Sequence, residues 1–166
     1  KHNRRGFIST TAVASLAAST MVHSATAAKA DPRPLRLAVI GCGGRGTGAI
    51  NDSLTINSGV TLVAAADLRL ENCERLFKSM SKEHPDKVDT QSTKLFSGLD
   101  GYKQVLNDPH VDVVLLTTSP GFRPRMVQAA VSAGKHVFAE KPVCVDAAGY
   151  QLCKGAHELA EKNKTA

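Results

Sequence analysis

Leu35–Gly48, with the sequence LRLAVIGCGGRGTG, is the stretch that decides the fold of this chain. Its first six residues are mostly apolar and suit a buried parallel strand. The next six fit the pattern G-x-G-x-x-G, in which the first glycine allows a tight turn, the second lets the backbone approach a pyrophosphate and the third lets a helix pack closely on the strand. The helix start offers free N–H groups to phosphate. We therefore predict a phosphate-binding turn made of Gly41, Cys42, Gly43, Gly44, Arg45 and Gly46.

A second strand, predicted over 60–66, ends in Asp67, 21 residues after Gly46. In dinucleotide-binding folds, a carboxylate about 20 residues beyond the glycines accepts hydrogen bonds from the adenosine ribose hydroxyls. Asp67 therefore indicates a dinucleotide site and favours NAD. Arg69 follows closely and can pair with the 2′-phosphate of NADP, so NADP stays an alternative. The competing interpretation is a glycine-rich turn with a structural role only.

The composition argues against two classes of partner. The net charge of +6 falls to +3 without Lys1, Arg4 and Arg5, and no cluster of Lys and Arg is interleaved with aromatic residues, so nucleic acid is not an expected partner. The four cysteines show neither CxxC nor Cys/His ligand spacing, so we expect no metal site. We predict isolated small residues, in the core or at the surface, for Cys42, Cys73, Cys144 and Cys153.

Residues 1–27 resemble a twin-arginine export signal. Arg4-Arg5 precedes a weakly apolar run, and Ala25-Thr26-Ala27 supplies small residues for cleavage. The run is too short and too polar for a stable membrane span. We therefore expect a periplasmic or otherwise exported protein, with residues 28–34 as a proline-containing linker. The alternative is a disordered tail rich in alanine and serine.

Beyond the leader, short apolar segments alternate with amphipathic ones. This alternation predicts a Rossmann-like α/β domain over 35–166, with a doubly wound parallel sheet. Asp146 is expected to cap the last helix, and Gly134 to end the helix before it. The predicted strands lie at 35–40, 60–66, 94–96, 111–117 and 137–139, and the predicted helices at 45–54, 70–81, 101–107, 123–133 and 147–162.

With these residues in place, the chain resembles the N-terminal half of the Gfo/Idh/MocA family, the glucose–fructose oxidoreductase and inositol dehydrogenase group. The resemblance rests on the glycine loop, Asp67, the segment VDVV at 111–114 and, most specifically, AGKHVFAEKP at 133–142. It implies NAD(P)-dependent oxidoreduction of a sugar, polyol or related alcohol. It also implies that Lys141 is catalytic, beside the nicotinamide and the reacting hydroxyl. Further cofactor contacts are expected from Thr117, Ser119 and Glu140.

The chain departs from the family pattern in two respects. Ser119 stands where the family commonly has proline, and Arg123 stands where it has histidine, which alters the loop on the nicotinamide side. The family's C-terminal α+β domain, which carries the catalytic histidine, holds the substrate and usually makes homo-oligomers, has no counterpart here. We therefore expect a truncated chain that binds the cofactor without turning over an alcohol.

Three alternatives stay open at this stage. Some exported relatives are glycosidases that use NAD for transient oxidation and elimination. The chain can also be an inert cofactor-binding fragment. Finally, the Glu-Lys-Pro segment at 140–142 can merely shape the turn after its strand, with Pro142 fixing the backbone.

Overall fold

The strand that precedes the glycine loop, β1 (Leu35–Ile40), lies at the centre of a five-stranded sheet. The computed structural model describes residues 33–166, so the predicted leader and most of the predicted linker lie outside the described residues. All strand pairs are parallel, and the order is β3-β2-β1-β4-β5. The other strands are β2 (Val60–Asp67), β3 (Lys94–Ser97), β4 (Val113–Leu116) and β5 (His136–Ala139).

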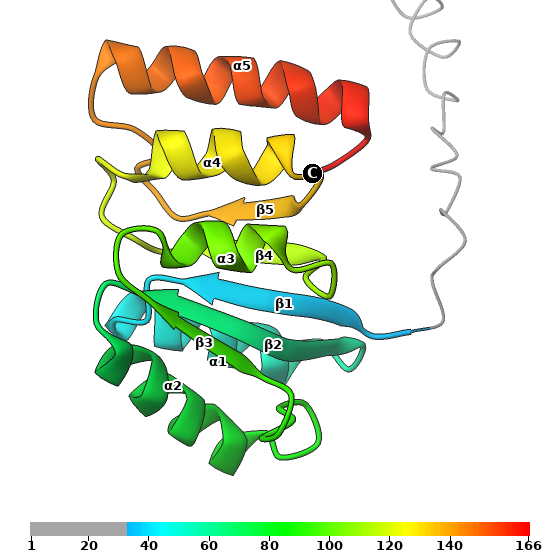
Figure 1. The fold of residues 1–166 in the computed structure, drawn as a ribbon. Helices are drawn as coiled ribbons and strands as arrows, with labels where there is room; N and C mark the ends of the chain where they lie inside the picture. The colour runs from blue at the N-terminus through cyan, green and yellow to red at the C-terminus, as the bar shows by residue number, and fades with distance from the viewer. Residues whose placement is uncertain (1–32) are drawn as a thin grey trace, which may run out of the picture. The chain divides into compact units, whose positions relative to one another are not determined.

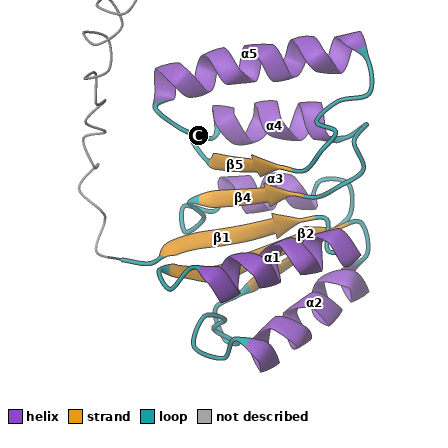
Figure 2. Cartoon of the chain, turned by 180° about the vertical axis from the view of Figure 1, so that it is seen from behind, coloured by secondary structure: helices purple, strands orange, loops and turns teal. Residues whose placement is uncertain are grey.

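Helices cover both faces of the sheet, as the predicted doubly wound fold requires (Figures 1 and 2). The pair α1 and α2 lies on one face, and α3 and α4 lie on the other, while α5 packs against α4. The bounds are α1 (Gly44–Ile56), α2 (Leu70–Glu83), α3 (Gly101–Asn107), α4 (Arg123–Ser132) and α5 (Ala147–Asn163).

The side chains of β1 alternate between two apolar cores, because successive residues of a strand point to opposite faces. Leu37 and Val39 join the core with α1 and α2. Ala38 and Ile40 join the core on the opposite face, where they meet α3 and α4. Both pairs are at most 5% exposed, so β1 is covered on both faces, as the central strand of a parallel sheet should be.

The sequence placed the elements correctly and missed some boundaries. β4 begins at Val113 and not at Val111, because Val111 N–H donates to Asp108 O at 3.2 Å and closes a turn there. α5 begins after Asp146, whose carboxylate accepts from Gly149 N–H at 2.6 Å, as the predicted cap requires. Gly134 follows α4 with a φ of +71°, a conformation that suits glycine at a helix end.

A cluster of charged residues holds the amino-terminal edge of the sheet. Asp112, just before β4, accepts two hydrogen bonds from the Arg36 guanidinium, at 3.0 and 2.9 Å. Lys135, just before β5, is buried and donates to Asp108 O and Val111 O, both at 2.8 Å. Burial alone would raise the pKa of Asp108, but hydrogen bonds from Lys94 and His110 lower it to about 2. The cluster therefore joins β1, β4 and β5 at one end.

The packing of α1 on β1 predicts that position 46 tolerates only glycine. A Cβ atom at this position would lie 1.9 Å from Gly41 O and 2.8 Å from Thr117 Oγ1. We expect Gly46→Ala to lower the free energy of unfolding by about 1–3 kcal/mol, because the helix must move off the strand. Gly44→Ala is the matched control, since a Cβ there meets nothing within 4 Å. Chemical denaturation measures both, and equal stability of the two variants would contradict the assignment.

Candidate functional site

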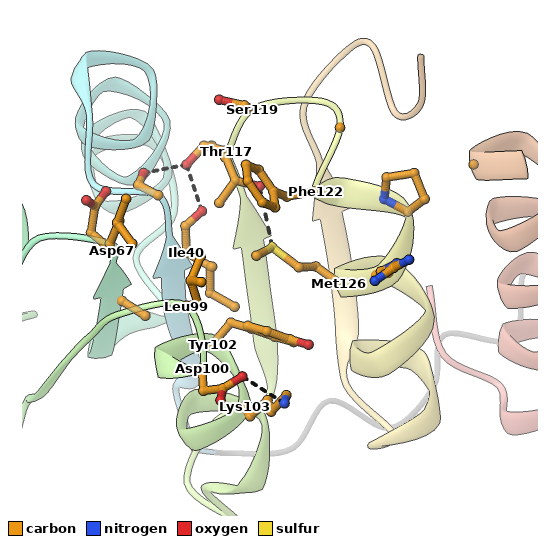
Figure 3. A pocket seen from close by; sticks show the side chains of 18 of the residues that line it. Ile40, Asp67, Leu99, Asp100, Tyr102, Lys103, Thr117, Ser119, Phe122 and Met126 are labelled. Carbon is orange, nitrogen blue, oxygen red and sulfur yellow. Dashed lines mark hydrogen bonds and ion pairs between the residues drawn. The ribbon is translucent and has the colours of Figure 1, made fainter. Parts of the chain in front are cut away.

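A cleft of about 830 Å³ opens at the carboxyl ends of the strands. One wall follows β1 and β2 and the other follows β4, on either side of the point where the strand order reverses. Open α/β sheets bind ligands at this point, and the volume lies within the ~300–1,000 Å³ typical of ligand pockets. Figure 3 shows ten of the lining residues by name: Ile40, Asp67, Leu99, Asp100, Tyr102, Lys103, Thr117, Ser119, Phe122 and Met126.

Gly41 makes the turn that brings the chain from β1 to the cleft. Its φ of +99° lies in the left-handed region, and a Cβ would lie 2.7 Å from the backbone nitrogen of Thr118. Gly41 N–H donates to Ala66 O at 2.7 Å, and the Thr117 hydroxyl donates to Gly41 O at 2.7 Å. The turn is therefore bound to both neighbouring strands. Thr117, a predicted cofactor contact, lines the cleft and also supports this turn.

The start of α1 fits a phosphate group. Gly43 precedes the helix, is exposed, and has open space where its Cβ would stand, with nothing within 4 Å. No side chain caps the helix and its first turn holds no acidic residue, so α1 itself carries no negative charge at its start. Gly43 lines the cleft. These features give a pyrophosphate both space and N–H donors.

Asp67 lies in the same cleft and is already hydrogen bonded within the protein. Its Oδ2 accepts from Cys42 N–H at 2.7 Å, and its Oδ1 accepts from Arg69 N–H at 3.1 Å and from the Asn72 amide at 2.8 Å. Burial opposes ionisation, but these bonds lower the pKa of Asp67 below its ordinary value. A carboxylate has about four acceptor positions, so one remains for a ribose hydroxyl. Asp67 thus ties the glycine loop to the start of α2.

The other predicted contacts fall into two groups. Ser119 is exposed and lines the cleft, and its carbonyl accepts from Phe122 N–H at 3.0 Å. Arg69 is exposed next to the cleft residues Asp67 and Leu68, and it precedes α2, but its side chain does not line the cleft. The side chain of Cys42 is buried beneath the loop, and its backbone N–H donates to the Asp67 carboxylate.

Glu140 joins the glycine loop to the turn after β5. Its carboxylate forms an ion pair with Arg45, in the first turn of α1, and accepts from Lys141 N–H at 3.0 Å. The ion pair with Arg45 lowers the pKa of Glu140. Glu140 N–H also donates to Leu116 O at 3.0 Å. The structure therefore brings Arg45, Glu140 and Lys141 together at the carboxyl edge of the sheet. Lys141 itself is exposed and does not line the cleft.

Arg123 is a residue whose position the sequence did not reveal. Its side chain is only 5% exposed, and its guanidinium Nη1 donates to Pro142 O. Its buried Nε has no hydrogen-bond partner among the described residues. Lys141 is therefore flanked by Glu140, held toward α1, and by Pro142, held toward α4. The one signal available in the sequence was the family resemblance, in which Arg123 stands where the family commonly has histidine.

The far wall of the cleft was also missed. This wall is formed by Leu99 and Asp100, which lie between β3 and α3, and by Tyr102 and Lys103 in the first turn of α3. Leu68 lines the cleft beside them. Leu99 is 70% exposed and Leu68 63% exposed, so apolar surface faces the opening. The rule that ligands bind at the carboxyl ends of parallel strands predicts this wall once the position of β3 is known.

Within residues 33–166, no helix is long and apolar enough to cross a membrane. No group of three or more His, Cys, Asp or Glu side chains in the same range is placed to hold a metal ion.

The chain also matches a known protein family. Residues 35–166 match the family described as "Oxidoreductase family, NAD-binding Rossmann fold", GFO_IDH_MocA. The chain belongs to this family. The match confirms the family resemblance and the Rossmann-like fold that the sequence indicated, and it identifies the domain as an NAD(P)-binding oxidoreductase domain of this family.

Curated relatives include inositol 2-dehydrogenases. That of Pseudomonas fluorescens is 34% identical over 117 residues, covering 69% of this chain and 31% of the relative. That of Salmonella typhimurium is 29% identical over 129 residues, covering 78% and 34%. This chain therefore spans about a third of the length of the curated relatives it matches.

Solved structures share the fold. The myo-inositol 2-dehydrogenase of Lactobacillus plantarum gives a TM-score of 0.62 at 24% identity, covering 79% of this chain and 34% of that one. A 3-ketoreductase from Actinomadura kijaniata, solved in complex with NADP, gives 0.60 at 22% identity, covering 80% and 37%. This likeness shows a shared fold.

The open space at Gly43 gives a direct test of the phosphate site. We expect Gly43→Val to abolish NAD binding, because the side chain would fill the space that a pyrophosphate needs. Stability should change little, since the backbone of Gly43 is extended (φ −73°) and a Cβ meets nothing within 4 Å. Gly48→Val, further along α1 and equally free of contacts, is the control. Isothermal titration calorimetry measures binding, and unchanged affinity of Gly43→Val would show that the phosphates bind elsewhere.

Proposed function

We propose that this chain is the cofactor-binding part of an oxidoreductase that transfers a hydride between NAD(P) and a sugar, polyol or related alcohol. The observation that carries the proposal is the Glu140-Lys141-Pro142 turn, held on both sides at the edge of the sheet that carries the glycine loop. Membership of the NAD-binding family and the similarity to inositol 2-dehydrogenases support it.

Different residues of the cleft would contact different parts of the cofactor. Gly43 and the start of α1 would face the pyrophosphate, and Asp67 would accept from a ribose hydroxyl. The adenosine end would lie toward Leu68 and Leu99, whose exposed apolar surfaces would then be covered. Bound NAD(P) supplies a hydride acceptor or donor at its nicotinamide ring.

Lys141 would act on the hydroxyl of the substrate. An ammonium group next to a hydroxyl stabilises a developing alkoxide and can exchange a proton with it. Glu140 and Arg123 would fix the backbone around Lys141, so that its side chain starts from a defined position. No residue of this chain is proposed to hold the substrate, because the chain spans only about a third of the length of the curated relatives that it matches.

The test uses the whole product of the natural gene, with any sequence that follows residue 166, screened with NAD and a panel of polyols and aldoses for NADH formation. We expect saturable turnover of at least one of them by the whole product, and NAD binding without turnover by residues 28–166 alone. Lys141→Ala should lower kcat by roughly 10²–10⁴-fold while NAD binding stays nearly unchanged. Lys162→Ala, an exposed lysine on α5, is the control. Turnover that survives Lys141→Ala would refute the assigned role, and release of free sugar without net NADH would select the glycosidase alternative.

The choice between NAD and NADP gives a second test. We propose that NAD binds more tightly, on the order of tenfold, because the Asp67 carboxylate repels a 2′-phosphate. Asp67→Asn should narrow the difference while keeping one acceptor for Cys42 N–H. Arg69→Ala should weaken NADP binding alone, since Arg69 follows Asp67 closely in the chain and an arginine near this carboxylate can pair with the extra phosphate. Calorimetric titrations of both cofactors decide this, and tighter binding of NADP to the unmodified protein would overturn it.

We also propose export through the twin-arginine route. The support is the sequence alone: Arg4-Arg5 before an apolar run, and small residues at 25–27. This route carries folded proteins, which suits a protein that acquires a nucleotide cofactor before it leaves the cytoplasm.

A further inference from the structure

Two cysteines that the sequence predicts to be isolated meet beneath the glycine loop. The Sγ atoms of Cys42 and Cys73 are 3.6 Å apart, although the residues are 31 positions apart in the chain. Cys42 is 1% exposed and Cys73 is fully buried. Cys42 stands between the first two glycines of the loop, and Cys73 lies in the first turns of α2. The pair thus links the loop that faces the phosphates to a neighbouring helix.

We propose that Cys42 and Cys73 form a reversible disulfide, and that the oxidised protein binds NAD more weakly than the reduced protein. The S–S bond length of about 2.05 Å requires the sulfurs to approach by roughly 1.5 Å. Both thiols also lie 3.4 Å from a backbone carbonyl, Ala66 O for Cys42 and Phe96 O for Cys73. The one thiol hydrogen of Cys42 can be donated either to Ala66 O or to Cys73 Sγ. Oxidation removes this hydrogen and that of Cys73, and the S–S bond takes the place of the contact between the two sulfurs.

The oxidant is a small disulfide such as oxidised glutathione. One protein thiolate attacks a glutathione sulfur, and the first glutathione leaves as a thiolate. The second protein thiolate then attacks the mixed disulfide and displaces the second glutathione. Two S–H bonds of the protein are lost, one S–S bond forms, and the two protons and two electrons end on two molecules of reduced glutathione.

Cys73 is the better first nucleophile. The Cys42 thiol donates its hydrogen toward Cys73 Sγ, and this hydrogen bond lowers the pKa of Cys73. Cys73 also lies near the N-terminus of α2, where the helix dipole favours an anion. Because both sulfurs are buried, the reaction needs the glycine loop to open. A cofactor lying on Gly43 would hold the loop closed, so bound NAD should slow the oxidation.

The effect on NAD follows from the neighbours of Cys42 in the chain. Its N–H donates to Asp67, and Gly43 next to it lies open to the cleft. Drawing Cys42 toward α2 displaces the peptide that joins it to Gly43. The N–H donors then no longer match the position of the phosphates.

The experiment uses the full chain with Cys144→Ser and Cys153→Ser, which leaves only the two cysteines of interest. The chain is treated with oxidised glutathione, with and without saturating NAD. Intact mass and peptide mapping then detect the bond, and calorimetry measures NAD binding before and after dithiothreitol. We expect a Cys42–Cys73 disulfide, slower formation with NAD, and a several-fold rise in the NAD dissociation constant that dithiothreitol reverses.

Cys73→Ala in the same background is the matched control, with Cys73→Ser as a second variant if alanine impairs folding. The NAD affinity of either should not respond to the oxidant. Recovery of the free thiols alone, or of glutathione adducts alone, would overturn the proposal. A disulfide with unchanged NAD affinity would overturn the coupling to the cofactor. Failure of the reduced chain to bind NAD would count against the proposed function instead, because the mass measurement does not depend on the cofactor.

Discussion

The structure depends on a contact at which three elements meet without room for a methyl group. Gly46 of α1 lies directly over the carbonyl of Gly41, and the hydroxyl of Thr117 closes the same space from the end of β4. A helix can start this close to a strand only where the helix residue at the contact is a glycine. This close packing places the start of α1 at the cleft, because Gly43, the residue just before the helix, lines it.

Two carboxylates hold the glycine loop from opposite sides. Asp67 accepts from the backbone of Cys42, and Glu140 pairs with the guanidinium of Arg45. Their pKa values both lie below the ordinary range, so both stay ionised at neutral pH. Each negative charge is met by donors of the protein itself. The loop is therefore fixed in shape before any cofactor binds, which reduces the ordering that binding would require.

The sequence predicted those features that depend on neighbouring residues. The strand before Gly41, the acid at position 67 and the cap at Asp146 follow from local patterns, and the structure has all three at their predicted places. The start of β4 was placed two residues early, because an apolar run does not show where a turn closes. A local pattern signals a residue's own conformation but not its distant partner.

Side-chain pairs between distant residues could not be predicted for that reason. Arg45 and Glu140 are 95 positions apart, and Cys42 and Cys73 are 31 apart. Arg123 reaches Pro142 only because α4 and the turn after β5 are adjacent in the folded sheet. The family pattern marked Arg123 as unusual, but its contact depends on tertiary packing that no spacing in the chain encodes.

The charged cluster at the amino-terminal edge of the sheet contributes to stability at a distance from the cleft. Arg36, Asp108, Asp112 and Lys135 join the strands at the end opposite the cleft, and none of them lines it. Substitutions there alter how firmly the strands are joined without touching the surfaces that are proposed to meet phosphate and ribose. The thermal stability of the domain can therefore be engineered at one end of the sheet while the cleft at the other end stays the same.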